Sequence, residues 1–73
     1  MITEAIYKRL GLAIYDRRER LGLTQAQLAR IVGLTRSSIA NIESGRQRIL
    51  LHDVYAFCGA FDVTPQTLMK EVW

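Results

Sequence analysis

The chain has 73 residues, enough for one domain with a modest core, since small chains bury a smaller fraction of their surface than large ones. Hydrophobic residues make up 49% and charged residues 23%, a balance that excludes a disordered tail, and no run reaches the ~20 apolar residues of a membrane span. The formal charge is +3, but residues 17–48 hold seven arginines and two acids, a surplus that predicts either a face that approaches phosphates or a solvated arginine face.

The first predicted helix covers residues 4–21. Thr3 followed by Glu4 is typical of a helix start. Apolar residues then recur at a spacing near 3.6, and those expected to face inward are Ile6, Leu10, Ala13, Ile14 and Leu21. Gly22 is expected to end the helix, because glycine tolerates the left-handed backbone of a C-terminal cap.

Two shorter helices follow, joined by a tight turn. Thr24 is expected to cap a helix that begins near Gln25, and Thr35 is expected to cap another over residues 36–43. Gly33 lies between them, where the chain must turn sharply and a positive φ is needed. The spacing therefore predicts a helix-turn-helix.

The faces of these two helices follow from their periodicity. Ala29 is small where two helices crossing at ~90 to 120° come close. Ile39 and Ile42 lie three positions apart, so both are expected to enter the core. This leaves a polar outer face on the helix over residues 36–43, made of Arg36, Ser37, Asn41 and Ser44.

A fourth helix is predicted in the apolar run after the polar loop 46–48, and a fifth begins near Pro65, which suits a first helical turn. No good capping residue precedes the fourth helix. The residues expected to face inward are Leu51, Val54, Phe57, Cys58, Phe61, Leu68, Met69 and Val72. With five helices and no strand pattern, the predicted fold class is all-α.

The sequence gives little support to a catalytic or metal-binding role. Cys58 is the only cysteine, so we interpret it as a small core residue, and His52, the only histidine, as a surface residue. No nucleophile–base pair, phosphate-binding glycine loop or carboxylate cluster stands out. We therefore expect no enzyme activity, no metal, no cofactor and no small-molecule ligand.

The stretch LGLTQAQLARIVGLTRSSIANIESGRQR resembles the signature of the Cro/repressor-type (XRE) helix-turn-helix family. The similarity continues through FCGAFDVTPQTLM and covers about residues 10–69. The resemblance implies a five-helix, lambda-repressor-like DNA-binding domain over residues 1–73. In that family the third helix enters the major groove of double-stranded DNA, while the second crosses above it and contacts the backbone.

The resemblance also implies roles for individual residues. Arg36, Ser37 and Asn41 match positions that reach base edges, and pairings such as arginine with guanine or asparagine with adenine discriminate by ~1 to 3 kcal/mol each. The alternative is that Arg36 or Asn41 binds phosphate. The residues that match phosphate-contacting positions are Gln25, Thr35, Ser38, Ser44, Arg46 and Arg48, of which Arg48 has simple solvation as an alternative. Arg18 and Glu43 match an ion pair between the first and third helices.

Leu50 and Leu51 follow Ile49 where the family often has proline, so an aliphatic patch for dimerisation is expected there. Val72 and Trp73 at the chain end are further candidates for the dimer interface, with Trp73 folding onto its own domain as the alternative.

The expected function is a cytoplasmic, sequence-specific transcription regulator of bacterial or phage origin, without a membrane partner, that binds a pseudopalindromic operator as a homodimer. Phage repressors, Cro-like proteins and restriction-modification controllers all fit. The alternative is an antitoxin-type interaction module that neutralises a partner and autoregulates by binding DNA.

Overall fold

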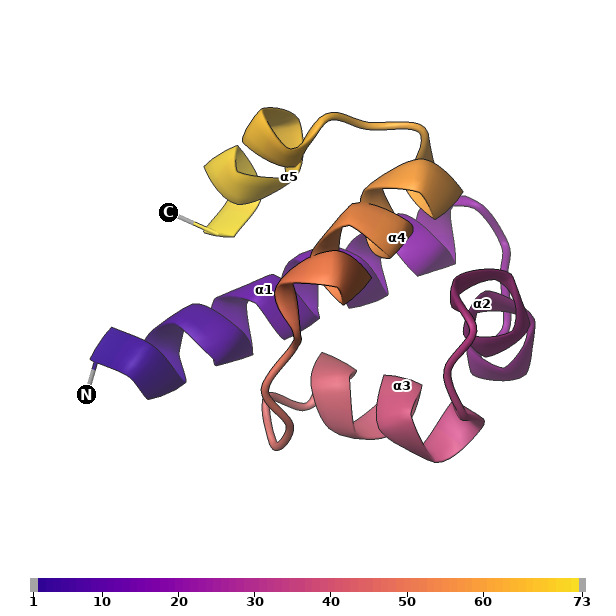
Figure 1. Ribbon diagram of the computed structural model, residues 1–73, viewed down its shortest axis with the longest axis horizontal. Coiled ribbons are helices and arrows are strands. Elements are labelled where there is room, and N and C mark those ends of the chain that lie inside the picture. Colours follow the sequence, from indigo (N-terminus) through magenta and orange to yellow (C-terminus); the bar gives the residue numbers. More distant parts are fainter. Residues whose placement is uncertain (1, 73) are drawn as a thin grey trace.

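The computed structural model describes residues 2–72, which form five α-helices without a strand (Figure 1). The helices are α1 (Ile2–Arg20), α2 (Gln25–Val32), α3 (Arg36–Glu43), α4 (Leu51–Phe61) and α5 (Pro65–Val72). The predicted all-α class is confirmed, as are the predicted bounds of α3. Only α1 departs by more than a residue at one end: it begins at Ile2, so Thr3 lies within the helix instead of capping it.

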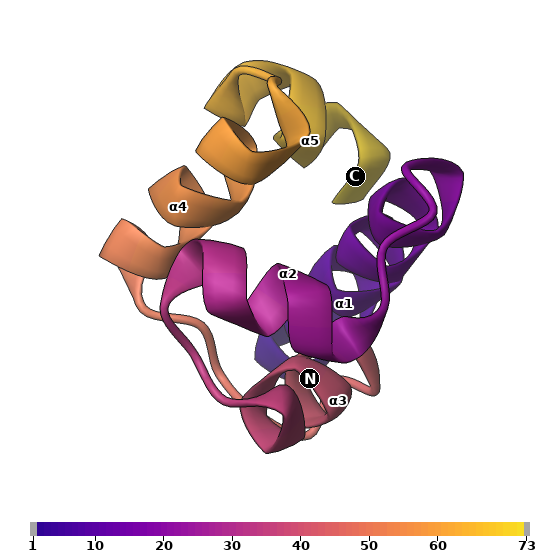
Figure 2. The same ribbon diagram turned by 90° about the vertical axis from the view of Figure 1, so that its right-hand side faces the viewer.

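The long helix α1 is the support on which the others pack. It contacts α3, α4 and α5, and Figure 1 shows it between α3 on one side and α5 on the other. The second helix, α2, contacts α3 and α4. In Figure 2, α2 crosses above α3, which forms the lower edge of the molecule. The helix-turn-helix therefore lies at an edge, with α3 outermost.

All five helices contribute to one hydrophobic core. The largest fully buried side chains are Ile14, Leu28, Ile39, Ile42, Phe57 and Leu68. The rings of Phe57 and Phe61 stack with centroids 6.1 Å apart. The inward-facing positions predicted above include Ile14, Ile39, Ile42, Phe57, Phe61 and Leu68, and their burial confirms the helical periodicity from which that prediction was made.

Three apolar residues that were expected to face inward are exposed instead. Leu21 is 53% exposed because α1 ends at Arg20, and Leu51 is 74% exposed at the first residue of α4. Met69 is 37% exposed beside a small apolar pocket. Val72 is only 4% exposed, as its inward-facing position predicts, and this burial in the domain's own core conflicts with its second assignment to the dimer interface. The other terminal candidate, Trp73, lies outside the described residues.

The helix starts follow the predicted capping chemistry. At α2, the hydroxyl of Thr24 accepts a hydrogen bond from the Gln27 backbone N–H at 3.0 Å, and the Gln27 side chain accepts one from the Thr24 N–H at 2.8 Å. At α3, the Thr35 hydroxyl accepts from the Ser38 N–H at 3.1 Å. By contrast, α4 begins after Leu50 without a side-chain cap, as expected. Gly33 has a φ of 75°, which makes the turn between α2 and α3 possible.

A glycine that the pattern did not single out sets the distance between α1 and α3. A Cβ at Gly11 would overlap the carbonyl oxygen of Ile42 and would lie 3.0 Å from that of Glu43. Both oxygens belong to the last turn of α3, so only glycine at this position of α1 allows the backbones to approach so closely. The orientation of α3 thus depends on a residue in another helix.

Candidate nucleic-acid interface

The outer face of α3 is polar and accessible. Arg36, Ser37 and Ser44 are exposed and Asn41 is half-buried, whereas Ile39 and Ile42 on the opposite face lie in the core. The three residues predicted to read bases therefore share one side of one helix, with Asn41 about one turn beyond Arg36 and Ser37. Each of the three keeps solvent-exposed surface within the described chain, although that of Asn41 is only partial.

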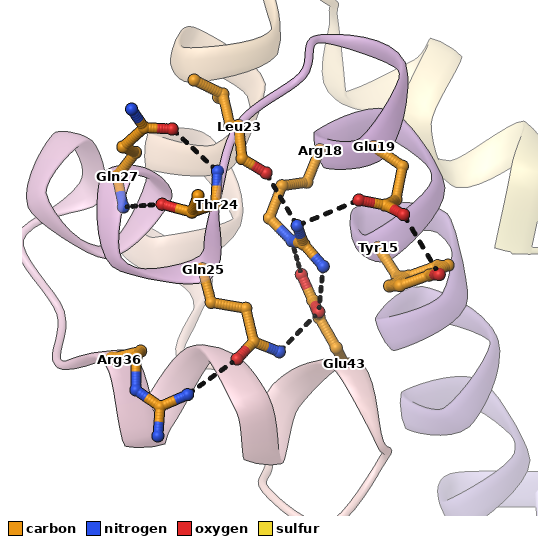
Figure 3. Close-up of polar contacts among 9 residues, drawn as sticks. All are labelled: Tyr15, Arg18, Glu19, Leu23, Thr24, Gln25, Gln27, Arg36 and Glu43. Carbon is orange, nitrogen blue, oxygen red and sulfur yellow. Dashed lines mark hydrogen bonds and ion pairs between the residues drawn. The ribbon is translucent and has the colours of Figure 1, made fainter.

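A buried ion pair attaches α3 to α1, as the resemblance implies (Figure 3). The Arg18 guanidinium donates to both carboxylate oxygens of Glu43, at 2.7 and 3.1 Å, and to the carbonyl oxygen of Leu23 at 2.7 Å. The hydrogen bond to Glu43 is the main reason that the pKa of Arg18 is raised above its ordinary value. One side chain thereby fixes α1, α3 and the turn before α2 relative to one another.

The amide of Gln25 links this buried pair to the surface of α3. Its Nε2 donates to Oε1 of Glu43 at 3.1 Å, and its Oε1 accepts from Nη1 of Arg36 at 3.2 Å (Figure 3). A continuous series of hydrogen bonds thus runs from Arg18 in the interior to Arg36 on the outer face. Because an amide nitrogen carries two hydrogens, Gln25 keeps a second N–H for an anion.

The hydroxyl groups at the two ends of α3 differ in what they can offer to phosphate. Thr35 and Ser38 lie at the N-terminal end, where free backbone amides and the helix dipole favour an anion. Ser44 lies at the C-terminal end, where the dipole is unfavourable to an anion, and its hydroxyl already donates to the carbonyl oxygen of Asn41 at 3.0 Å. To donate to a phosphate, Ser44 must first give up that bond.

The basic segment separates into two groups. Three of its arginines lie in α1 and form ion pairs: Arg17 with Glu71, Arg18 with Glu43 and Arg20 with Asp16. The charge count over residues 17–48 treated these three arginines like the others, because a partner such as Glu71, 54 positions from Arg17, lies outside that segment. Within residues 2–72, the exposed side chains of Arg30, Arg46 and Arg48 make no ion pair, and these arginines of the segment lie on α2 and in the loop after α3.

The sequence pattern did not predict the role of Tyr15, a residue of α1 that contacts the Arg18 side chain of the buried pair. The Arg18 guanidinium lies 5.3 Å from the centroid of the Tyr15 ring, a cation–π contact. The Tyr15 hydroxyl donates to Oε1 of Glu19 at 3.3 Å, and Oε2 of Glu19 accepts from Arg18 at the same distance. The signal for this contact is the i, i+3 and i+4 spacing of these three residues on one helix.

The remaining chemistry-bearing side chains do not gather into a second site. Across residues 2–72, no three metal-ligating side chains lie close enough together to hold an ion, and no helix there is both long and apolar enough to cross a bilayer. Cys58 is buried, and burial raises the pKa of its thiol, while His52 is exposed. Both were predicted in these places.

Comparison with known proteins agrees with this geometry. The clp gene regulator ClgR from Corynebacterium glutamicum has a similar structure, with a TM-score of 0.88 and 21% identity over 92% of this chain and 71% of that chain. The restriction-modification controller C.AhdI from Aeromonas hydrophila gives 0.80 and 29% over 85% and 94%. The controller C.Esp1396I, crystallised as a tetramer with its natural 35 base-pair operator, gives 0.78 and 22% over 92% and 93%.

No curated protein matches the chain as a sequence. A family model described as helix-turn-helix, however, matches residues 14–68, which include α2, α3 and α4 in full. The matched region contains both partners of the buried ion pair and the whole polar face of α3. The chain belongs to the XRE-type helix-turn-helix family of DNA-binding transcription regulators.

Proposed function

We propose that this chain is a sequence-specific transcription regulator that acts by binding double-stranded DNA and not by catalysis, with α3 in the major groove. The observation that carries the proposal is the accessible polar face of α3, held at the molecular edge by the buried Arg18–Glu43 pair. A helix presented in this way has the geometry that the recognition helix of a helix-turn-helix requires. Because its partner is DNA, we place the protein in the cytoplasm.

In this proposal the residues of the site divide into readers and positioning contacts. Arg36, Ser37 and Asn41 reach base edges, since they share the outer face of α3. The side chains that contact phosphates are Gln25, Thr35, Ser38, Arg46 and Arg48, joined by Ser44 once its bond to Asn41 is exchanged. Such contacts fix the register of the protein on the duplex without carrying sequence information.

We further propose a homodimer on a pseudopalindromic operator. The solved complex of C.Esp1396I holds a tetramer on DNA, which supports self-association among proteins of this fold. In this chain Leu50 and Leu51 are 62% and 74% exposed, Met69 lines the same small pocket as Leu51, and the exposed Tyr55 lies four residues after Leu51 in α4. We place the dimer interface on Leu50 and Leu51, because an exposed aliphatic patch is favourably buried against a second copy.

Selection of bound duplexes from a random pool, followed by a salt titration, tests DNA recognition. We expect one enriched motif, and log affinity that falls steeply with log salt as phosphate contacts are screened. Arg36→Ala is expected to relax the base preference at one position of the motif, whereas Arg46→Ala is expected to weaken binding to all sequences alike. Absence of binding at low salt would overturn the proposal and would favour the interaction-module reading.

Variants at two exposed leucines test the dimer. Leu51→Asp is expected to give a monomer in sedimentation analysis and to lose tight binding to the full operator. Leu12→Asp is the matched control, because Leu12 is 59% exposed on α1, away from the proposed patch. Half-sites about one helical turn, ~34 Å, apart are expected, so a spacer changed by half a turn should abolish tight binding. A monomeric wild type, or indifference to the spacer, would contradict the homodimer.

A further inference from the structure

The loop that follows α3 lies directly against the N-terminal half of α1. Gly45 has a φ of 79°, and a Cβ built on it would lie 3.0 Å from Cα, 3.3 Å from Cβ and 3.1 Å from Cγ of Lys8. The first part of the Lys8 side chain therefore passes over the backbone of Gly45. The next residue in the loop is Arg46, one of the proposed phosphate contacts.

The position of Lys8 is fixed relative to α3 by two sets of contacts. The loop is bonded to the end of α3, because the N–H of Gly45 donates to Ile42 O at 3.1 Å and that of Arg46 donates to Asn41 O at 2.9 Å. On α1, Gly11 lies three residues after Lys8 and abuts the last turn of α3. Residues three apart share a helix face, so Lys8 belongs to the face of α1 that is turned toward α3.

The charge of Lys8 is available to a partner. Lys8 is exposed and, among residues 2–72, forms no ion pair, in contrast to Arg17 and Arg20 on the same helix. Its stem packs on the loop while its ammonium group stays in water, which is the usual arrangement of a lysine at the edge of an apolar contact. A cation held beside the loop of Arg46 and Arg48 continues their positive surface onto α1.

We infer that Lys8 is a further phosphate-contacting residue, which extends the DNA footprint from the helix-turn-helix and its following loop onto α1. The inference rests on the proposed function, because it assigns one more contact to the same duplex. Lys8 approaches the backbone as a point charge and carries no sequence information. Its contribution therefore belongs to the salt-dependent part of the affinity.

The test compares Lys8→Gln with Lys70→Gln on long mixed-sequence duplex DNA over a range of salt concentrations. Lys70 is the matched control, since it is also an exposed lysine but lies in α5, across α1 from α3 (Figure 1). We expect Lys8→Gln to bind several-fold more weakly at low salt, with a slope of log affinity against log salt shallower by about 0.9, the value for one lost phosphate contact. Lys70→Gln and Lys8→Arg are expected to keep the wild-type slope.

The outcomes separate this inference from the function on which it depends. A wild-type protein that does not bind duplex DNA overturns both. A wild-type protein that binds, with Lys8→Gln matching its slope, overturns the Lys8 contact alone. Equal losses in Lys8→Gln and Lys70→Gln also overturn it, because they would reflect net charge and not a contact. Circular dichroism verifies that each variant retains the helical fold.

Discussion

Two parts of the molecule pack on α1 in different ways: the pair α2–α3, residues 25–43, and the pair α4–α5, residues 51–72. The first is attached by a directional contact, the buried Arg18–Glu43 ion pair, and each of its helices begins with a side-chain cap. The second is attached mainly by apolar burial and shares with α1 the partly exposed pair Arg17–Glu71. Its helix α4 begins without a side-chain cap, whereas at the start of α5 the Thr64 hydroxyl accepts from the Thr67 N–H at 3.1 Å.

The difference matches what each part has to do in the proposed function. Apolar burial is non-directional and stabilises many arrangements about equally, whereas a buried, fully bonded polar network specifies one geometry. A helix that reads base edges must be held at a defined angle, so α3 benefits from such a network. The pair α4–α5 needs only to complete the core, and it can leave leucines outside for a second copy.

Removing the buried carboxylate is the largest perturbation of the directional contacts. Glu43→Ala leaves Arg18 buried without its partner, and we expect the free energy of unfolding to fall by about 3 to 5 kcal/mol in chemical denaturation. Glu19→Ala is the control, because this exposed carboxylate contacts the same guanidinium and is expected to cost less than about 1 kcal/mol. A stable Glu43→Ala protein with altered sequence preference would show that Glu43 serves recognition instead.

The close approach of α1 and α3 is tested by Gly11→Ala. Alanine is the better helix former by about 1 kcal/mol, yet its methyl group would overlap the end of α3, so we expect a net loss of about 1 to 3 kcal/mol in thermal unfolding. Gly59→Ala is the matched control, since a Cβ at this glycine of α4 meets nothing within 4 Å and is expected to stabilise. Stabilisation by both substitutions would mean that α3 is not constrained by α1.

The difference in side-chain capping between α2 and α4 can be reduced by a substitution at the start of either helix. Thr24→Ala removes the cap of α2 and is expected to cost about 1 kcal/mol. Leu50→Asp supplies a capping carboxylate to α4 and is expected to gain about as much over Leu50→Ala, which removes the same leucine without providing a cap. Both are measured by denaturation below the concentration of dimerisation. Equal stability of the two Leu50 variants would show that the start of α4 gains nothing from a cap.

The smallest effect is expected at the contact between α1 and α5. Because Arg17 and Glu71 are partly exposed, a double-mutant cycle with Arg17→Ala and Glu71→Ala should give a coupling of about 0.2 to 1 kcal/mol that declines with salt. The exposed pair Arg20–Asp16 serves as the comparison. A salt-independent coupling as large as that of Arg18 with Glu43 would remove the distinction between the two halves.

The sequence predicted those features that local chemistry determines. Thr24, Thr35 and Gly33 act on backbone groups within a few residues, so their roles follow from short-range spacing alone. The position of Gly11 against Ile42 could not be predicted in this way, because it depends on how two helices meet in space.

The same distinction holds for the candidate site. The shared face of Arg36, Ser37 and Asn41 is a property of one helix, and spacing suffices to predict it. The Gln25 contacts join two different helices, and the Arg17–Glu71 pair joins residues 54 positions apart in the sequence, so periodicity within one helix does not indicate them. Periodicity placed Val72 in the core, where it lies, and only its second assignment to the dimer interface conflicts with its burial.

The hydrogen bond between Gln25 and Arg36 has a consequence for the thermodynamics of recognition. A free arginine loses its rotational freedom when it docks on a base, at a cost of about 0.5 to 1.5 kcal/mol for a long side chain. Arg36 is already restrained by an amide that is itself anchored to Glu43, so part of that ordering is complete before the duplex arrives. Gln25→Leu should therefore make the entropy of association less favourable, in addition to removing the phosphate contact proposed for Gln25.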